Sequence, residues 1–297
     1  MASTTAVVIE KTIYTGLCIE IKRYMSACVG QGITGSGKRL GKTPLRQLRY
    51  QDKKAQENCR WKLNCNFGGG DLFLTLCFPP YTPVARETVR KSINTFLDTL
   101  RRIYRRNGKK LQYVYTVGMT KKGMAHIHMV VNKFDTDTIT KCWQKIAGVP
   151  KSQKQEEKSP RVTIRHLDYS GEYRKLAEYL IKNSREQFYS SNKVHSKRFC
   201  ASKGLKMPLV TKRILQKRRF WTETPKPVPG YYIDPNSVYD TYGWTDNGGD
   251  FECCRVQGYT MYRIDGMYKK TRKTKYRQTM RTDDAPEVIE KFELEVT

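Results

Sequence analysis

The chain has 297 residues and a formal net charge of +28, from 56 Lys and Arg against 28 Asp and Glu. Hydrophobic residues make up 38% of it, enough for a packed core, which excludes wholesale disorder. The longest apolar stretch, residues 72–78, is far shorter than the roughly 18 residues that cross a bilayer, and the N-terminus lacks a secretory pattern. We therefore expect no membrane partner. So large an excess of positive charge favours a polyanion, with nucleic acid as the default.

The nine cysteines are scattered along the chain without a CxxC pair. A disulfide framework or a zinc site would need closer and more regular spacing. The pattern indicates reduced thiols in a cytoplasmic protein.

The predicted elements follow a basic, Gly-containing lead-in over residues 1–57 that we expect to be loosely ordered. Residues 72–78 are apolar and β-rich, between a Gly-rich turn and a Pro-Pro pair, which predicts a buried strand. Apolar residues spaced by three and four predict a helix that starts at Thr82-Pro83 and stops at Asn107-Gly108. Strands are predicted at 111–118 and 125–132.

The next predicted elements are a helix from 135–137 to 146, a polar loop at 151–160, a strand at 161–167 and a helix from 170 to about 188. Strands and helices alternate around one mostly antiparallel sheet, so the fold class is α+β, with helices flanking a central sheet. Residues 207–221 are basic with some helical spacing. Residues 211–267 form a Tyr/Pro/Gly-rich extension that we expect to wrap over the surface, and 268–297 a basic, then acidic tail.

Two short motifs carry candidate chemistry. His126 and His128 alternate along a predicted strand, so both imidazoles point to one face and can converge on a metal ion. Tyr179 and Lys182 are three residues apart on a predicted helix and share a face, where a lysine can stabilise a phenolate nucleophile. Alone, each motif is more often structural than functional.

In this order along the chain, the two motifs together resemble those of the HUH endonucleases. Within that superfamily the chain is similar to rolling-circle replication initiators of small phages, plasmids and integrative elements. The segments NFGGGDLFLTLCF, KKGMAHIH and FCASKGLKMP resemble further parts of the family pattern. The resemblance covers about residues 58–210 and implies a nuclease domain of ferredoxin- or RRM-like topology there, followed by a basic C-terminal extension.

The resemblance implies a mechanism as well as a fold. His126 and His128 would hold Mn²⁺ or Mg²⁺, of which Mn²⁺ suits imidazole better. Tyr179 would attack a phosphate of single-stranded DNA at an origin hairpin, giving a 5′-phosphotyrosine and a free 3′-OH, and the reversal would rejoin the strand. Lys182 would neutralise the developing charge. A separate host helicase and polymerase would be needed, in the cytoplasm of a bacterial host cell.

The chain departs from the family pattern at one point, because Gly118 stands where the family usually has a third, acidic metal ligand. The ligand would then come from Gln112, Glu172 or Glu178, or water would take its place. Tyr173 lies off the face of Tyr179, so we expect a single catalytic tyrosine.

A phosphate-binding loop is suggested by GITGSGKR (residues 32–39), but Arg39 replaces the Ser or Thr that binds Mg²⁺ in such loops. The segment is therefore expected to contact phosphate only as a basic arm.

Nucleic-acid contacts are expected from the basic surface. The candidate residues are Lys121, Lys122, Lys175, Arg213, Lys217, Arg218 and Arg219. Two alternatives to a replication initiator stay open: a single-strand transposase or conjugative relaxase with the same chemistry, and a catalytically idle nucleic-acid-binding protein of the same fold. Relaxases usually place the tyrosine before the histidines, which is the reverse of the order here.

Overall fold

The computed structural model describes residues 7–26, 45–79, 84–120, 124–148, 159–191, 193–216, 221–247 and 250–264. These residues divide into two compact units, with the boundaries after Lys53 and after Lys206. We call residues 54–206 the helical unit, and the described residues before 54 and after 206 the sheet unit. No helix among the described residues is long and apolar enough to cross a membrane. The predicted loop at 151–158, the segment 32–39 and the tail 268–297 lie outside the described residues.

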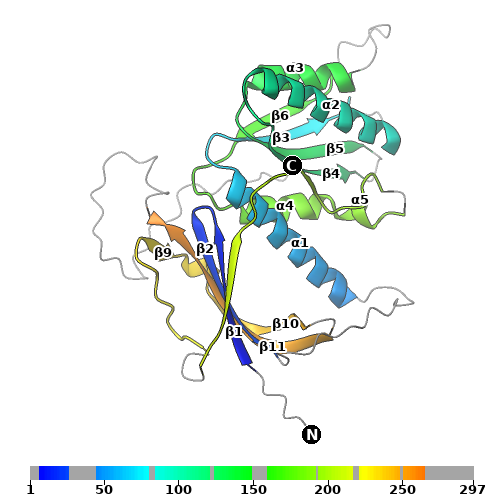
Figure 1. The fold of residues 1–297 in the computed structure, drawn as a ribbon. Coiled ribbons are helices and arrows are strands. Elements are labelled where there is room, and N and C mark those ends of the chain that lie inside the picture. Colours follow the sequence, from blue (N-terminus) through cyan, green and yellow to red (C-terminus); the bar gives the residue numbers. More distant parts are fainter. Residues whose placement is uncertain are drawn as a thin grey trace. The chain divides into compact units, whose positions relative to one another are not determined.

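The helical unit is built on a five-stranded antiparallel sheet with the strand order β6-β3-β5-β4-β7 (Figure 1). Its strands are β3 (Leu72–Cys77), β4 (Tyr113–Met119), β5 (Ala125–Val131), β6 (Val162–His166) and β7 (Cys200–Ala201). The antiparallel sheet with flanking helices confirms the α+β class predicted from the sequence.

Helices cover both faces of this sheet (Figure 1). One core lies under α2 (Arg86–Arg106) and α3 (Thr136–Ala147). The opposite core lies under α4 (Arg174–Asn183) and the later residues of α1 (Leu45–Asn66). Because side chains alternate along a strand, Met129 of β5 packs in the first core and its neighbour Val130 in the second.

The ends of the helices follow local capping rules. Asp135 caps α3, where its side chain accepts a hydrogen bond of 2.8 Å from the backbone N–H of Thr138. After α2 the chain turns at Gly108, whose φ of 67° favours glycine. The helix predicted from 170 to 188 is instead two helices, α4 and the short α5 (Arg185–Tyr189), separated at Ser184. The buried Ser184 hydroxyl donates to the Ile181 carbonyl oxygen and so competes with the helix ladder.

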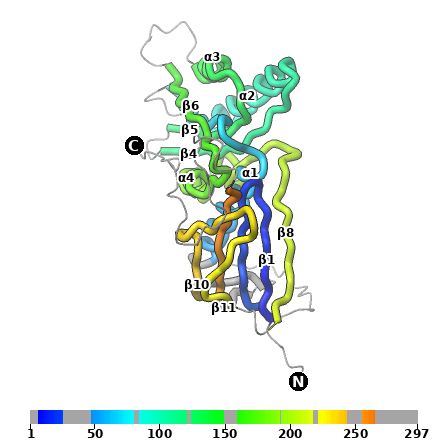
Figure 2. Tube along the Cα trace, turned by 90° about the vertical axis from the view of Figure 1, so that its left-hand side faces the viewer, coloured from blue at the N-terminus to red at the C-terminus, as the bar shows by residue number. Residues whose placement is uncertain are grey.

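The sheet unit corrects the expectations for both ends of the chain. In place of a loosely ordered lead-in over 1–57 it has β1 (Val7–Thr15), β2 (Cys18–Ser26) and the start of α1. In place of a surface extension over 211–267 it has further strands: β8 (Leu209–Ile214), β9 (Tyr231–Ile233), β10 (Tyr239–Asn247) and β11 (Asp250–Arg263), with a 3₁₀ turn, η2 (Pro235–Ser237), between β9 and β10. Their order is β10-β11-β2-β1-β8, with β9 paired to β11. The basic segment after Met207 is thus a strand beside β1, not a helix (Figure 2).

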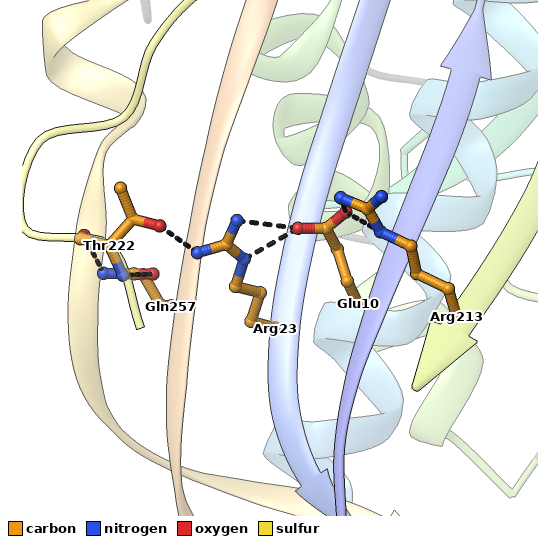
Figure 3. Close-up of polar contacts among 5 residues, drawn as sticks. All are labelled: Glu10, Arg23, Arg213, Thr222 and Gln257. Atoms are coloured by element: carbon orange, nitrogen blue, oxygen red, sulfur yellow. Dashed lines mark hydrogen bonds and ion pairs between the residues drawn. The ribbon is translucent and has the colours of Figure 1, made fainter. Parts of the chain in front are cut away.

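A row of polar side chains crosses this sheet in register. Glu10 of β1 is directly opposite Arg23 on one neighbouring strand and Arg213 on the other. The Nε atoms of both arginines donate to the Glu10 carboxylate, each at 2.8 Å (Figure 3). Arg23 also donates to Thr222, and the backbone N–H of Thr222 donates to the side chain of Gln257 at 3.0 Å (Figure 3). Because Glu10 is only 4% exposed, its charge depends on these partners.

This arrangement predicts unequal costs for removing the two sides of the ion pair. Glu10→Ala should lower the free energy of unfolding of the sheet unit by about 3 kcal/mol, because it leaves Arg23 beside a lost buried partner. Arg213→Ala should cost about 1 kcal/mol at most, because the Arg213 side chain is 67% exposed and its ion pair is screened by water. Urea unfolding followed by circular dichroism measures both, and equal losses would contradict the assignment of Glu10 as the centre of the row.

Candidate active site

The two candidate metal-binding histidines lie on the central strand of the helical unit. In the register of the sheet, His126 of β5 lies between Cys77 of β3 and Gly118 of β4. His128 lies one alternate position further on, between Thr75 and Thr116. The centres of the two imidazole rings are 4.9 Å apart.

Tyr179 reaches this pair from helix α4. Its hydroxyl lies 3.2 Å from Nε2 of His128, within hydrogen-bonding distance. The other ring nitrogen of His128, Nδ1, lies 3.2 Å from the hydroxyl of Thr75. Phe73 stacks on the His128 ring at 5.8 Å and meets the Tyr179 ring edge-on at 6.1 Å. The structure therefore brings Tyr179 and the two histidines together, although the histidine strand and the tyrosine helix are separate elements.

The packing of α4 explains why Tyr179 points to the sheet. Leu176, Leu180 and Ile181 of this helix are buried in the core that also contains Phe73. Tyr179 packs at the edge of the same core and is partly exposed. Lys182, three residues further along α4, is exposed to solvent. The helix thus presents a half-buried phenol beside a solvated ammonium group.

Burial keeps both imidazoles in their neutral form. It lowers the pKa of His126, and it lowers the pKa of His128 to about 3, with a smaller effect from the neighbouring His126. A neutral imidazole keeps the lone pair that a metal ion needs. Burial raises the pKa of Tyr179, and the positive charge of Arg165 acts against this increase.

Arg165 is a residue of the site that sequence reasoning missed. It lies on β6 directly opposite Phe73, the residue that packs on both His128 and Tyr179. One signal was present, because Arg165 alternates with Leu167, which is buried in the same core as Phe73. The alternation alone did not show which strand would lie beside it.

Gly118 has a structural reason for being a glycine. A Cβ atom at this position would lie 2.2 Å from Nε2 of His126. The His126 ring thus occupies the space that a side chain at position 118 would need. This excludes an acidic ligand there unless His126 moves.

The other candidates for a third metal ligand do not join the histidines. Gln112 precedes β4 at the end opposite Gly118, and Glu172 lies 3.8 Å from Arg60. Within the described part of the chain, no group of three or more His, Cys, Asp and Glu could hold a metal ion. The residues present therefore fit a divalent ion held by two neutral imidazoles, with its remaining positions open to water or phosphate oxygens.

The remaining predicted residues are distributed over the chain. Tyr173 is buried at the start of α4, and its hydroxyl donates to the Asp168 carbonyl oxygen at 3.0 Å. Lys175 is exposed on α4, whereas Arg213 is paired with Glu10 in the sheet unit. The other nucleic-acid candidates lie outside the described residues: Lys121, Lys122, Lys217, Arg218 and Arg219.

Comparison with protein families decides what kind of domain this is. Residues 71–185 match the family model of the ORF2-type replication-associated protein. Through this segment the chain belongs to the ORF2 family of replication-associated proteins. This is a family of rolling-circle replication initiators of phages, which confirms the resemblance drawn from the sequence motifs. No curated protein and no solved structure matches the chain.

The family assignment carries some general properties. Proteins of the ORF2 family are replication initiators and generally nicking enzymes, and initiation implies binding to origin DNA. The matched segment contains both histidines of β5 as well as Tyr179 and Lys182 of α4.

The close approach of His126 to Gly118 generates a prediction for metal binding. Gly118→Ala should weaken Mn²⁺ affinity by about 10- to 100-fold, because the new Cβ displaces the His126 imidazole. Gly68→Ala is the matched control, since an added Cβ there meets no atom within 4 Å. Electron paramagnetic resonance of free Mn²⁺ measures both affinities. Equal affinities in the two variants would show that the His126 position does not matter for the metal.

Proposed function

We propose that this ORF2-family protein starts rolling-circle replication by nicking single-stranded DNA at an origin and later rejoining it, with Tyr179 as the nucleophile. The observation that carries the proposal is the 3.2 Å contact between the Tyr179 hydroxyl and Nε2 of His128, beside a second neutral histidine. A phenol held at a candidate metal site has little structural purpose, whereas it is the arrangement that a tyrosine transesterification needs.

The residues of the site divide the work of the reaction. His128 holds the Tyr179 hydroxyl, and Thr75 orients the His128 ring through Nδ1. His126 and His128 would hold Mn²⁺ or Mg²⁺, which supplies positive charge to polarise the scissile phosphate when bound. Arg165 favours the ionised phenol, since its charge lowers the pKa of Tyr179. Lys182, exposed on the same helix, neutralises charge that develops on the phosphate.

The chemical step is a transesterification that conserves the number of phosphate esters. A bond forms between the Tyr179 oxygen and phosphorus, and the bond from phosphorus to the 3′ oxygen breaks. The phenol proton is lost, and the leaving 3′ oxygen takes up a proton to become the free 3′-OH. Attack by a 3′-OH on the phosphotyrosine reverses the step and rejoins the strand. The 3′-OH primes synthesis by a host polymerase, with a separate host helicase, in the cytoplasm of a bacterial host cell.

A second candidate function is supported by the unusual metal site. Because Gly118 and His126 leave no room for an acidic ligand, a catalytically idle protein that only binds origin DNA would also carry this site. A transposase or relaxase would share the chemistry, but the family match favours a replication initiator.

The proposal predicts a covalent protein–DNA adduct that depends on a single hydroxyl. Wild type, incubated with pooled single-stranded hairpin oligonucleotides and Mn²⁺, should give an adduct that survives boiling in detergent. Tyr179→Phe and a metal chelator should each abolish it. Tyr173→Phe is the matched control, because it removes a tyrosine hydroxyl near the start of the same helix that bonds to the backbone of Asp168, and it should keep the adduct.

Two results would overturn this proposal. An adduct that persists in Tyr179→Phe would exclude this residue as the nucleophile. If no oligonucleotide gives an adduct while salt-sensitive DNA binding is retained, the idle binding protein is the better description.

The site also predicts how the two cations contribute to the rate. Arg165→Gln should slow adduct formation by about 100-fold, since one preorganised charge at a reacting oxygen contributes about that much. Arg165→Lys should recover part of the rate, because it keeps the positive charge, and Lys182→Gln should slow the reaction less because Lys182 is solvated. Single-turnover kinetics measure these rates. Equal rates in wild type and Arg165→Gln would remove Arg165 from the mechanism.

A further inference from the structure

The helical unit contains a groove lined by many cations, which we call the basic groove. Its volume is about 1040 Å³. The C-terminal end of α2, the turn that follows it, the start of β4 and the turn after β7 form its walls. Its basic lining residues are Arg101, Arg102, Arg105, Lys109, Lys110 and Lys203.

The basic groove is separate from the candidate active site. It lies at the end of β4 where Tyr113 begins the strand, whereas Gly118, which contacts His126, is near the other end. At about 3.3 Å per residue, the five steps between these positions span roughly 16 Å. The two sites also lie on different faces, since Tyr113 packs under α2 and Tyr179 packs under the opposite face of the sheet.

The backbone that carries these cations is held in place by hydrogen bonds. The turn after β7 is fixed to β4, because the Ser202 N–H donates to the Tyr113 carbonyl at 2.9 Å and the Tyr113 N–H donates to the Ser202 hydroxyl at 3.2 Å. The turn after α2 is fixed by a 2.9 Å bond from the Lys109 N–H to the Tyr104 carbonyl. The Arg101 guanidinium donates to the Tyr113 hydroxyl at 3.0 Å. The frame is therefore preorganised, while the six basic side chains are exposed at its surface.

Stabilisation of the helix explains only part of this charge. Basic residues near the end of α2, such as Arg105, interact favourably with the partial negative charge of a helix C-terminus. Lys203 comes from a different segment and does not belong to the helix. Asp98 is the one acidic residue among the described residues that line the groove, and it is already ion-paired with Arg101. Like charges that gather from three segments repel one another unless a polyanion neutralises them.

The lining favours duplex DNA over a single strand. Proteins that bind single strands place exposed aromatic rings where bases can stack. Tyr113 is the one aromatic residue among the described residues lining the groove, and it is only 8% exposed. Exposed Lys and Arg without a stacking platform are what contacts to the phosphate backbone of a duplex require.

We propose that the basic groove binds the phosphate backbone of double-stranded DNA adjoining the nicked single strand, so that the protein holds duplex and single strand at two sites. This inference rests on the proposed function for its biological setting, but the binding itself is measured independently of nicking. The contacts are to phosphate, so the groove sets affinity and orientation without reading the base sequence.

The test compares two triple variants of the full chain that lose the same charge. The groove variant is Arg102→Gln with Arg105→Gln and Lys203→Gln. The control variant is Lys91→Gln with Lys141→Gln and Lys145→Gln, which removes three exposed lysines of α2 and α3 that do not line the groove. The probes are a blunt-ended duplex of mixed sequence and one of its single strands, with affinities measured by fluorescence anisotropy over a range of salt concentrations. Thermal unfolding shows that both variants are folded.

The groove variant should bind the duplex about tenfold or more weakly, and the slope of log K against log salt should fall by about 2 to 3, against less than about 1 in the control. It should still bind the single strand and form the tyrosine adduct at the wild-type rate. Equal loss in both variants would show that only net charge matters, and would overturn the proposal. Equal loss for duplex and single strand would also overturn it. A groove-specific loss of duplex binding in a protein that never forms an adduct would support the groove and contradict the proposed function.

Discussion

The pairing of β5 between β3 and β4 is the constraint on which the candidate site depends. It sets His126 against Gly118 and His128 against Thr75, and it turns both imidazoles to the face covered by α4. Because side chains alternate along a strand, a slip of one residue would turn the histidines into the core under α2 and α3. The buried residues between them, such as Ile127, oppose that slip. The register that buries the core is therefore also the register that builds the site.

The position of Gly118 shows how one small residue changes the chemistry of the site. With no side chain at 118, the His126 ring lies across the neighbouring strand, and the position cannot also supply a carboxylate. Two neutral imidazoles form a less charged site than one that includes a carboxylate. Such a site leaves more of the ion's coordination to water and to the substrate, and it places more of the charge stabilisation on cations such as Arg165.

The large positive charge of the chain is not used in one way. In the sheet unit, Arg23 and Arg213 neutralise the buried Glu10 and so stabilise the strand pairing. In the helical unit, Arg102 and Lys203 are exposed at a groove whose described lining is mostly basic. Net charge predicts a polyanionic partner for the whole molecule, but only the local partners of each cation distinguish a structural role from a binding role.

The sequence by itself determined the elements whose signals are local and the chemistry that depends on spacing within one element. These include the strand at β3, the helix ending before Gly108, the shared face of His126 and His128, and the position of Tyr179 on a helix. Only the tertiary structure decided that β1 and β2 pair with β8 and β11, because those partners are far apart in the sequence and an isolated hairpin is only marginally stable. The same holds for Arg165 beside Tyr179 and for His126 over Gly118. Each is a contact between strands or between a strand and a helix, and side-chain periodicity shows which face a residue takes without showing which neighbour covers it.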